Sequence, residues 1–416
     1  MSTRARERIY GLDLLRAIAM FLGILLHSAM AFTSVDIPYW PVRDPSPSVF
    51  ADLLIVSIKG FRMQLFFFLA GFFGAMVYER RGLNLFLRNR MLRIGIPLAF
   101  SILIIQPILQ ALWIKGRTSS LVPSGIFLSP DGALLDHFIS GHFLNCLSLM
   151  HFWFLYYLLA LYGVVALFHV FTPGLSEFLL VRLRGVLARP YAVGVLAVFT
   201  APLLWPMKYW GMIDMPNDFF INPMILVYYL CFFLGGWTTW GDRGLLTVLS
   251  HGFPTKMLFG LFVFLPLSIA CMLYGLHSSQ NLALARVVHL VSCLSSAFYS
   301  WLMVIGLIGA ILALPLGNSG VIRYLSDSAY WCYLWHLPLI LALQELLLLT
   351  SVAGLPSFLL VVSVSTATLV ATYQLLVRNT LIGTILNGKR QGILTSKRRS
   401  KGNGIRRHRD LALPAS

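Results

Sequence analysis

Charged residues are scarce in this chain. Asp, Glu, Lys and Arg together make up 11% of its 416 residues, whereas hydrophobic residues make up 58%. Soluble domains carry about 25% charged residues, so a deficit of this size excludes an ordinary water-soluble protein. The composition is that of a protein that crosses a membrane several times.

Cysteines and soluble loops are also sparse. The five cysteines are far apart, form no C-x-x-C pair and fall mostly inside apolar runs, which argues against a disulfide framework and a thiolate metal site. Since no close set of His, Cys and carboxylate residues occurs, we expect no metal and no bound cofactor. The longest predicted loop, residues 114–150, is too short and too apolar to fold alone. Any chemistry must therefore take place within the membrane domain.

Long apolar runs are what the chain has in abundance. A run of roughly 20 residues crosses a bilayer at a rise of about 1.5 Å per residue. We expect an all-α polytopic integral membrane protein with about ten transmembrane helices. The runs lie near residues 10–33, 52–78, 91–113, 151–171, 190–206, 222–240, 256–276, 285–314, 326–349 and 355–377.

Lys and Arg residues concentrate in alternate loops, which explains the net charge of +17 without nucleic acid as a partner. They precede the first run, lie between the second and third and between the fourth and fifth, and fill the tail. The positive-inside rule then places both termini in the cytoplasm. We divide the chain into a basic N-terminus (1–9), a transmembrane domain (10–378) and a basic tail (379–416), which we expect to be disordered at the anionic leaflet.

Three titratable residues interrupt the first apolar run, LDLLRAIAMFLGILLHSAM: Asp13, Arg16 and His27. A charge near the centre of a membrane helix is unfavourable by at least ~2.5 kcal/mol, so such residues are candidates for function. At 100° per residue, the step from Arg16 to His27 returns to within about 20° of one face, about 16 Å along the axis. We expect both to face one cavity, with Asp13 paired to Arg16. In the predicted orientation, Arg16 lies in the cytoplasmic half and His27 toward the outside. A buried polar cluster that only fixes helix packing is the alternative.

This arginine and histidine, inside LDLLRAIAMFLGILLH, resemble the signature of the membrane acyltransferase 3 family. FRMQLFFFLAGFFGAM (61–76), RNRMLRIGIP (88–97), HFWFLYYLL (151–159) and YWCYLWHLP (330–338) are similar to further segments of that family, although Ala70 stands where Ser is usual. FRMQ and HFWFL resemble most the glucans biosynthesis protein C branch. The resemblance implies O-acyl transfer at the bacterial inner membrane, from cytoplasmic acyl-CoA as co-substrate to a hydroxyl of an envelope glycan. For this branch it implies succinyl transfer to periplasmic glucans.

Catalytic roles follow from side-chain chemistry within that reaction. His27 is the expected general base, because an imidazole pKa of about 6.5 suits proton removal near neutral pH. A transient acyl-histidine is the alternative. Arg16 stays protonated, so it is expected to position the donor or stabilise the transition state. Arg90 and Arg93 are expected to bind the phosphates of the acyl donor, with membrane anchoring as the alternative.

Other polar residues within the apolar runs are candidates for substrate binding. Arg62, with Gln64, begins the second run at its predicted outer end and is suited to hold the free carboxylate of a succinyl group, or to reach the lipid headgroups. His336 is a candidate catalytic residue and His151 a candidate substrate ligand, with structural roles as the alternative. Glu345 is a candidate for orienting the base.

Two further expectations complete the interpretation. Four tryptophans are assigned to an interfacial aromatic belt: Trp40, Trp113, Trp205 and Trp210. A proton-coupled secondary transporter, with Asp13, Arg16 and His27 as a relay, is the main alternative function, and an envelope flippase or scaffold is a third. The two halves of the chain show no matching pair of broken helices of the kind that marks many transporters.

Overall fold

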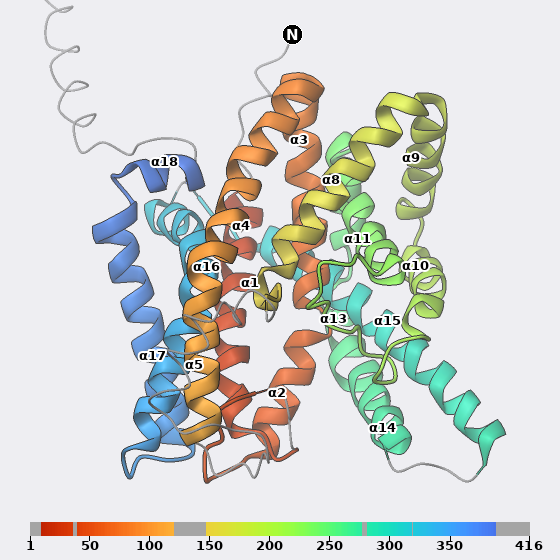
Figure 1. The fold of residues 1–416 in the computed structure, drawn as a ribbon. Helices are drawn as coiled ribbons and strands as arrows, with labels where there is room; N and C mark the ends of the chain where they lie inside the picture. The colour runs from red at the N-terminus through yellow and green to blue at the C-terminus, as the bar shows by residue number, and fades with distance from the viewer. Residues whose placement is uncertain (1–9, 36–39, 120–146, 277–280, 318, 388–416) are drawn as a thin grey trace, which may run out of the picture.

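The computed structural model describes residues 10–35, 40–119, 147–276, 281–317 and 319–387 (Figure 1). Within these ranges every regular element is a helix, which confirms the predicted all-α membrane fold. The α-helices are α1 (Tyr10–Ala29), α2 (Val49–Lys59), α3 (Arg62–Arg90), α4 (Ile96–Phe100), α5 (Gln106–Ser119), α8 (Trp153–Phe171), α9 (Pro173–Leu187), α10 (Ala192–Thr200), α11 (Pro223–Gly241), α12 (Gly244–Ser250), α13 (Phe253–Phe259), α14 (Leu265–Leu276), α15 (Leu282–Ala313), α16 (Gly320–Leu348), α17 (Leu355–Thr372) and α18 (Leu381–Asn387).

Eight helical stretches in the described part of the chain are long and apolar enough to cross a membrane. One of them, Val49–Gly116, is 68 residues long and contains two of the predicted runs. The chain reverses within it at Gly82, whose φ of 70° a residue with a side chain rarely adopts. Figure 1 shows α3 rising to the top of the view before the chain descends through α4 and α5.

The predicted run near residues 190–206 is the exception. Its helix covers Ala192–Leu204, which at about 1.5 Å per residue is roughly 20 Å long, short of a hydrocarbon core of about 30 Å. Pro202 lies in its last turn, η6 (Ala201–Leu204), and the helix ends there. This segment therefore differs from the other predicted spans in length.

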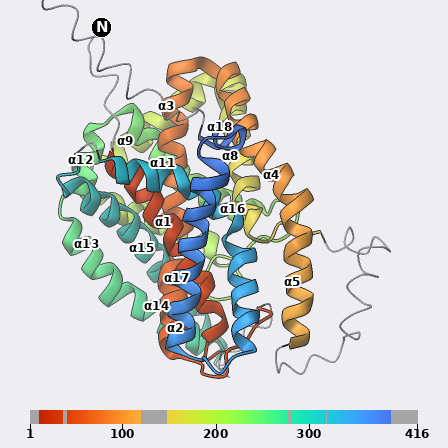
Figure 2. The same ribbon diagram turned by 90° about the vertical axis from the view of Figure 1, so that its left-hand side faces the viewer.

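Helix α1 lies inside the bundle, in contact with α2, α3, α15, α16 and α17. In Figure 2, α17 crosses in front of it. Leu12, Leu15 and Ala19 are fully buried, as expected for a helix that is apolar on all sides. The polar residues of α1 therefore face other helices or cavities between them.

Helices α3 and α11 pack closely enough for their backbones to touch. A Cβ atom on Gly71 would lie 1.9 Å from the carbonyl oxygen of Phe233, and one on Gly236 would lie 1.8 Å from that of Phe68. Only glycine fits at such a crossing. The small residues of AGFFGAM thus bring α3 against α11, which fixes the position of the helix that carries Arg62.

Candidate active site

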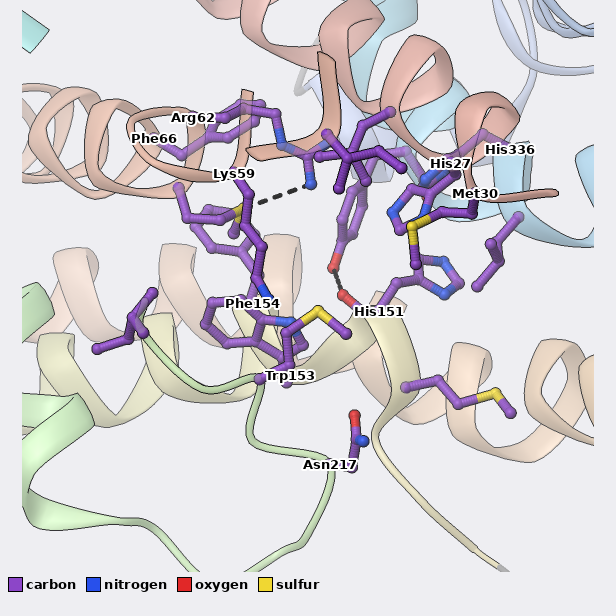
Figure 3. A pocket seen from close by; sticks show the side chains of 18 of the residues that line it. His27, Met30, Lys59, Arg62, Phe66, His151, Trp153, Phe154, Asn217 and His336 are labelled. Atoms are coloured by element: carbon purple, nitrogen blue, oxygen red, sulfur yellow. Dashed lines mark hydrogen bonds between the residues drawn. The ribbon is translucent and has the colours of Figure 1, made fainter. Parts of the chain in front are cut away.

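Three histidines from distant parts of the chain meet in one cavity (Figure 3). His27 comes from α1, His151 from the short helix η5 (Met150–Phe152) and His336 from α16. The ring centroids of His27 and His336 are 5.2 Å apart, and those of His151 and His336 are 5.1 Å apart. The imidazole of His336 therefore lies between the other two.

A backbone carbonyl orients one of these rings. Nδ1 of His336 lies 2.8 Å from the carbonyl oxygen of Tyr333, which can only accept, so Nδ1 carries the proton and Nε2 keeps its lone pair. Pro338, also in α16, lacks the N–H that would otherwise bind the Leu334 carbonyl, four residues earlier, within the helix.

Four ring nitrogens in this cluster are available for chemistry. Nδ1 of His27, both ring nitrogens of His151 and Nε2 of His336 are buried and have no hydrogen-bond partner among the residues that the structure describes. A buried polar atom without a partner is unfavourable, by about 1–3 kcal/mol, and such atoms in native proteins are found where a ligand or water binds. The arrangement thus suits proton transfer to or from a bound molecule.

The side-chain amide of Gln344, in α16, positions the ring that packs beside His27. The indole of Trp40 is nearly parallel to the His27 ring, at 14° and with centroids 5.9 Å apart. Its Nε1 donates to Oε1 of Gln344 at 3.1 Å, and Nε2 of Gln344 donates to the Ser28 carbonyl at 3.1 Å. Gln344 thereby ties Trp40 to the turn of α1 that follows His27.

Two cations face the same cavity, which has a volume of about 270 Å³ and which we call the outer cavity. Nη2 of Arg62 lies 3.6 Å from the sulfur of Met63, and Nη1 lies against Gly23, where a Cβ would be 2.1 Å away. No ion pair to Arg62 is found within the described ranges. Lys59 and Asp214 complete the charged lining. The outer cavity thus offers positive charge beside the histidines (Figure 3).

A second cavity of about 200 Å³, which we call the inner cavity, contains Arg16 and Arg90. Nη2 of Arg16 lies 3.6 Å from Oδ1 of Asp13, the predicted pair, and donates to Oγ of Ser326 at 2.6 Å. Nη1 of Arg90 donates to the Tyr162 hydroxyl at 3.3 Å. Leu386 of α18 also lines this cavity, so both ends of the described chain lie at this end of the bundle. Which side of the membrane that end faces rests on the positive-inside pattern.

The prediction that Arg16 and His27 share one cavity is wrong in detail. They line two adjacent cavities, which share four lining residues: Met20, Phe66, Phe154 and Tyr333.

Several predicted site residues lie outside both cavities. Gln64 is 1% exposed and donates to the Tyr228 hydroxyl at 3.2 Å. Arg93 is separated from Arg90 by the start of a π-helical turn, η3 (Met91–Gly95), and does not line the inner cavity. Oε2 of Glu345 lies 3.9 Å from Nζ of Lys115 and forms an ion pair with it. None of the three lines a cavity with His27 or Arg16.

The tryptophans divide into two groups. Trp40 and Trp113 line the outer cavity, with centroids 5.6 Å apart, so they do not belong to a lipid-facing belt. Trp205 and Trp210 both stack on His289, with ring centroids 4.1 and 4.7 Å from the centroid of its imidazole. Within the described residues no group of His, Cys, Asp and Glu is placed to hold a metal ion.

Three residues of the site were not singled out in the sequence: Gln344, Lys59 and Tyr333. Gln344 had a usable signal, because it is an amide next to Glu345 within an apolar run. Lys59 also had a signal, because it is a charge within the predicted run 52–78. Tyr333 had none, since tyrosine is common in membrane helices.

Comparison with known proteins identifies the family of the chain. The acyltransferase 3 family, described as an acyltransferase domain, matches residues 9–377. Glucans biosynthesis protein C of Shigella dysenteriae serotype 1 (strain Sd197) is 34% identical over 116 residues, which are 27% of this chain and 29% of that protein. The protein of the same name from Escherichia coli (strain SMS-3-5 / SECEC) matches to the same extent. The matched segment thus covers less than a third of these relatives, and no solved structure matches the chain.

The family match covers most of the transmembrane bundle and includes both cavities with their histidines and arginines. The chain is therefore a member of the acyltransferase 3 family and a multi-pass membrane protein.

Proposed function

We propose that the chain transfers an acyl group from cytoplasmic acyl-CoA to a hydroxyl of an envelope glycan at the bacterial inner membrane. The observation that carries the proposal is the pair of adjacent cavities. The inner one holds Arg16 and Arg90, which suit the phosphates of a nucleotide donor, and the outer one holds the three histidines. The names of the relatives, glucans biosynthesis protein C, support a glucan as the acceptor.

In the proposed reaction, His27 takes the proton of the acceptor hydroxyl as its oxygen attacks the thioester carbonyl carbon. The C–O bond forms, the C–S bond breaks, and the electron pair goes to sulfur. His27 then gives the proton to that sulfur, which leaves as the CoA thiol. Nε2 of His336 accepts a hydrogen bond from protonated His27, which is consistent with their centroid separation of 5.2 Å. A transient acyl-histidine at His27 is the alternative course.

The acyl group is proposed to be succinyl, with acetyl as the alternative. Arg62 and Lys59 face the outer cavity, and Arg62 has no ion-pair partner among the described residues. A buried guanidinium without a carboxylate is unfavourable until an anion reaches it. The free carboxylate of a succinyl group is such an anion, and a guanidinium binds it through two parallel hydrogen bonds.

The two cavities give less support to a proton relay in a transporter. Of the four residues that line both cavities, Met20, Phe66 and Phe154 have side chains that cannot carry a proton, and the hydroxyl of the fourth, Tyr333, donates to the His151 carbonyl rather than to Arg16 or His27. Acyl transfer does not need a proton to pass between Arg16 and His27.

Substitution of His27 tests the proposal. In purified protein reconstituted into vesicles with succinyl-CoA and a periplasmic glucan, His27→Ala is expected to lower the transfer rate by about 10²–10⁴-fold. His289→Ala is the matched control, since His289 lies outside both cavities. A folded His27→Ala protein that acylates at the wild-type rate refutes the mechanism. A wild-type protein that moves solute but transfers no acyl group supports the transporter instead.

A further inference from the structure

Four side chains line both cavities and therefore separate them. Met20 comes from α1, Phe66 from α3, Phe154 from α8 and Tyr333 from α16. We call these four residues the septum. Each helix that contributes to the septum also carries, or leads from, a residue of the proposed site, so the septum is built into the same framework.

Three of the four form an aromatic arc. The centroids of Phe66 and Phe154 are 5.4 Å apart, and those of Phe154 and Tyr333 are 6.0 Å apart in a T-shaped arrangement. The Tyr333 hydroxyl donates to the His151 carbonyl at 2.7 Å, which fixes that ring. The arc is therefore a stiff wall of contacting rings, with one end held by a hydrogen bond.

Met20, from α1, is the fourth and only non-aromatic member of the septum. It lies four residues after Arg16 and seven before His27, and at 100° per residue it is within about 40° of the face that carries Arg16. Its side chain is 4% exposed. An unbranched thioether with three rotatable bonds adapts its shape more easily than an aromatic ring. Met20 is thus the member of the septum that can move aside with the least disturbance of its neighbours.

We propose that the septum selects the acyl group by size, with Met20 setting the limit. The inference rests on the proposed function, in which the thioester reaches from the inner cavity to His27. The acyl group leads the thioester along that path, so it must pass Met20 and the aromatic arc before the reaction. Short groups such as acetyl and succinyl pass when Met20 turns, whereas a medium-length chain must displace a ring as well.

Shortening Met20 tests this selection. Reconstituted protein is assayed with acetyl-CoA, succinyl-CoA, hexanoyl-CoA and octanoyl-CoA, with a glucan as acceptor. Met20→Ala is expected to raise the octanoyl-to-acetyl ratio of transfer rates by about tenfold, since the fit of even one methylene in an apolar pocket changes selectivity by that order. Phe66→Leu enlarges the opening from another helix and is expected to shift the ratio in the same direction.

Met303→Ala is the matched control. Met303 is also 4% exposed but lies in a separate apolar cluster with Phe61, Leu265 and Tyr299, away from both cavities. It reproduces the loss of a buried methionine and is expected to keep the wild-type chain-length profile. Thermal unfolding in detergent shows that each variant is folded.

The outcomes separate this inference from the proposed function. A wild-type protein that transfers no acyl group from any donor refutes both. A wild-type protein that transfers, together with folded Met20→Ala and Phe66→Leu variants that keep its chain-length profile, overturns the septum inference alone. The same holds if Met303→Ala shifts the profile as much as Met20→Ala does.

Discussion

Gln344 makes the sharpest test of how the protein positions His27. It is 3% exposed, accepts a hydrogen bond from Trp40 and donates one to the Ser28 carbonyl. It touches no predicted substrate, so we regard it as a positioning residue. Gln344→Leu keeps most of the volume and removes both bonds.

The expected effects on stability and on catalysis differ in size. Hydrogen bonds between membrane helices contribute about 0.6 kcal/mol each on average and up to about 1.7, so the loss of two lowers stability by about 1–3 kcal/mol. That leaves the protein folded. Trp40 and the end of α1 are then free to shift, and a displacement of about 1 Å at the reacting groups lowers a rate by about 10²-fold. We expect kcat to fall by that factor, with KM for the donor unchanged.

A double-mutant cycle with Trp40→Phe identifies the cause. Trp40→Phe removes the indole N–H but leaves an aromatic ring beside His27. If Gln344 acts through Trp40, the effects of the two substitutions on kcat are not additive. Gln374→Leu serves as the control. Gln374 is exposed, accepts a hydrogen bond from Arg378 and lines neither cavity. Wild-type kcat in a folded Gln344→Leu protein would refute the positioning role.

Three further predictions concern the cations and the helix crossing. Arg62→Met is expected to lower succinyl transfer about 10–100-fold more than acetyl transfer, as the loss of a hydrogen bond to a charged group predicts; an equal fall with both donors contradicts the carboxylate role. Arg90→Gln is expected to raise KM for acyl-CoA several-fold, whereas Arg88→Gln, at an exposed position outside the inner cavity, leaves it unchanged; steady-state kinetics with varied acyl-CoA decides this. Gly236→Val is expected to destabilise the protein by at least about 1–3 kcal/mol, because its Cβ would overlap the Phe68 carbonyl, while Gly163→Ala, with open space around it, is tolerated; thermal unfolding in detergent compares the two.

The parts of the fold that were predictable depend on local periodicity. Apolar runs specify membrane helices one by one, and the angle between Arg16 and His27 follows from the geometry of a single helix. The pairing of Asp13 with Arg16 is local for the same reason, and the structure has it at 3.6 Å. Small residues such as those of AGFFGAM favour a close helix crossing, but the sequence does not identify the partner helix, which is α11.

The parts that were missed depend on how helices pack against one another. His336 meets His27 only because α16 lies beside α1 in one particular register, which no single-helix pattern contains. Arg93 was predicted to bind the donor together with Arg90, but the π-helical turn at Met91–Gly95 departs from regular helix geometry, and only Arg90 lines the inner cavity. Gln64 was a sound candidate by polarity, but its neighbour across the bundle, Tyr228, satisfies its amide nitrogen.

The septum has a consequence for the cell that is separate from acyl selection. In the predicted orientation the two cavities open toward opposite sides of the membrane, so a clear passage between them would conduct ions and discharge the membrane potential. A narrow apolar constriction excludes water and ions by dewetting. Under the proposed function, which draws its two substrates from different compartments, Met20, Phe66, Phe154 and Tyr333 are expected to act as an electrical seal that keeps those compartments insulated from each other.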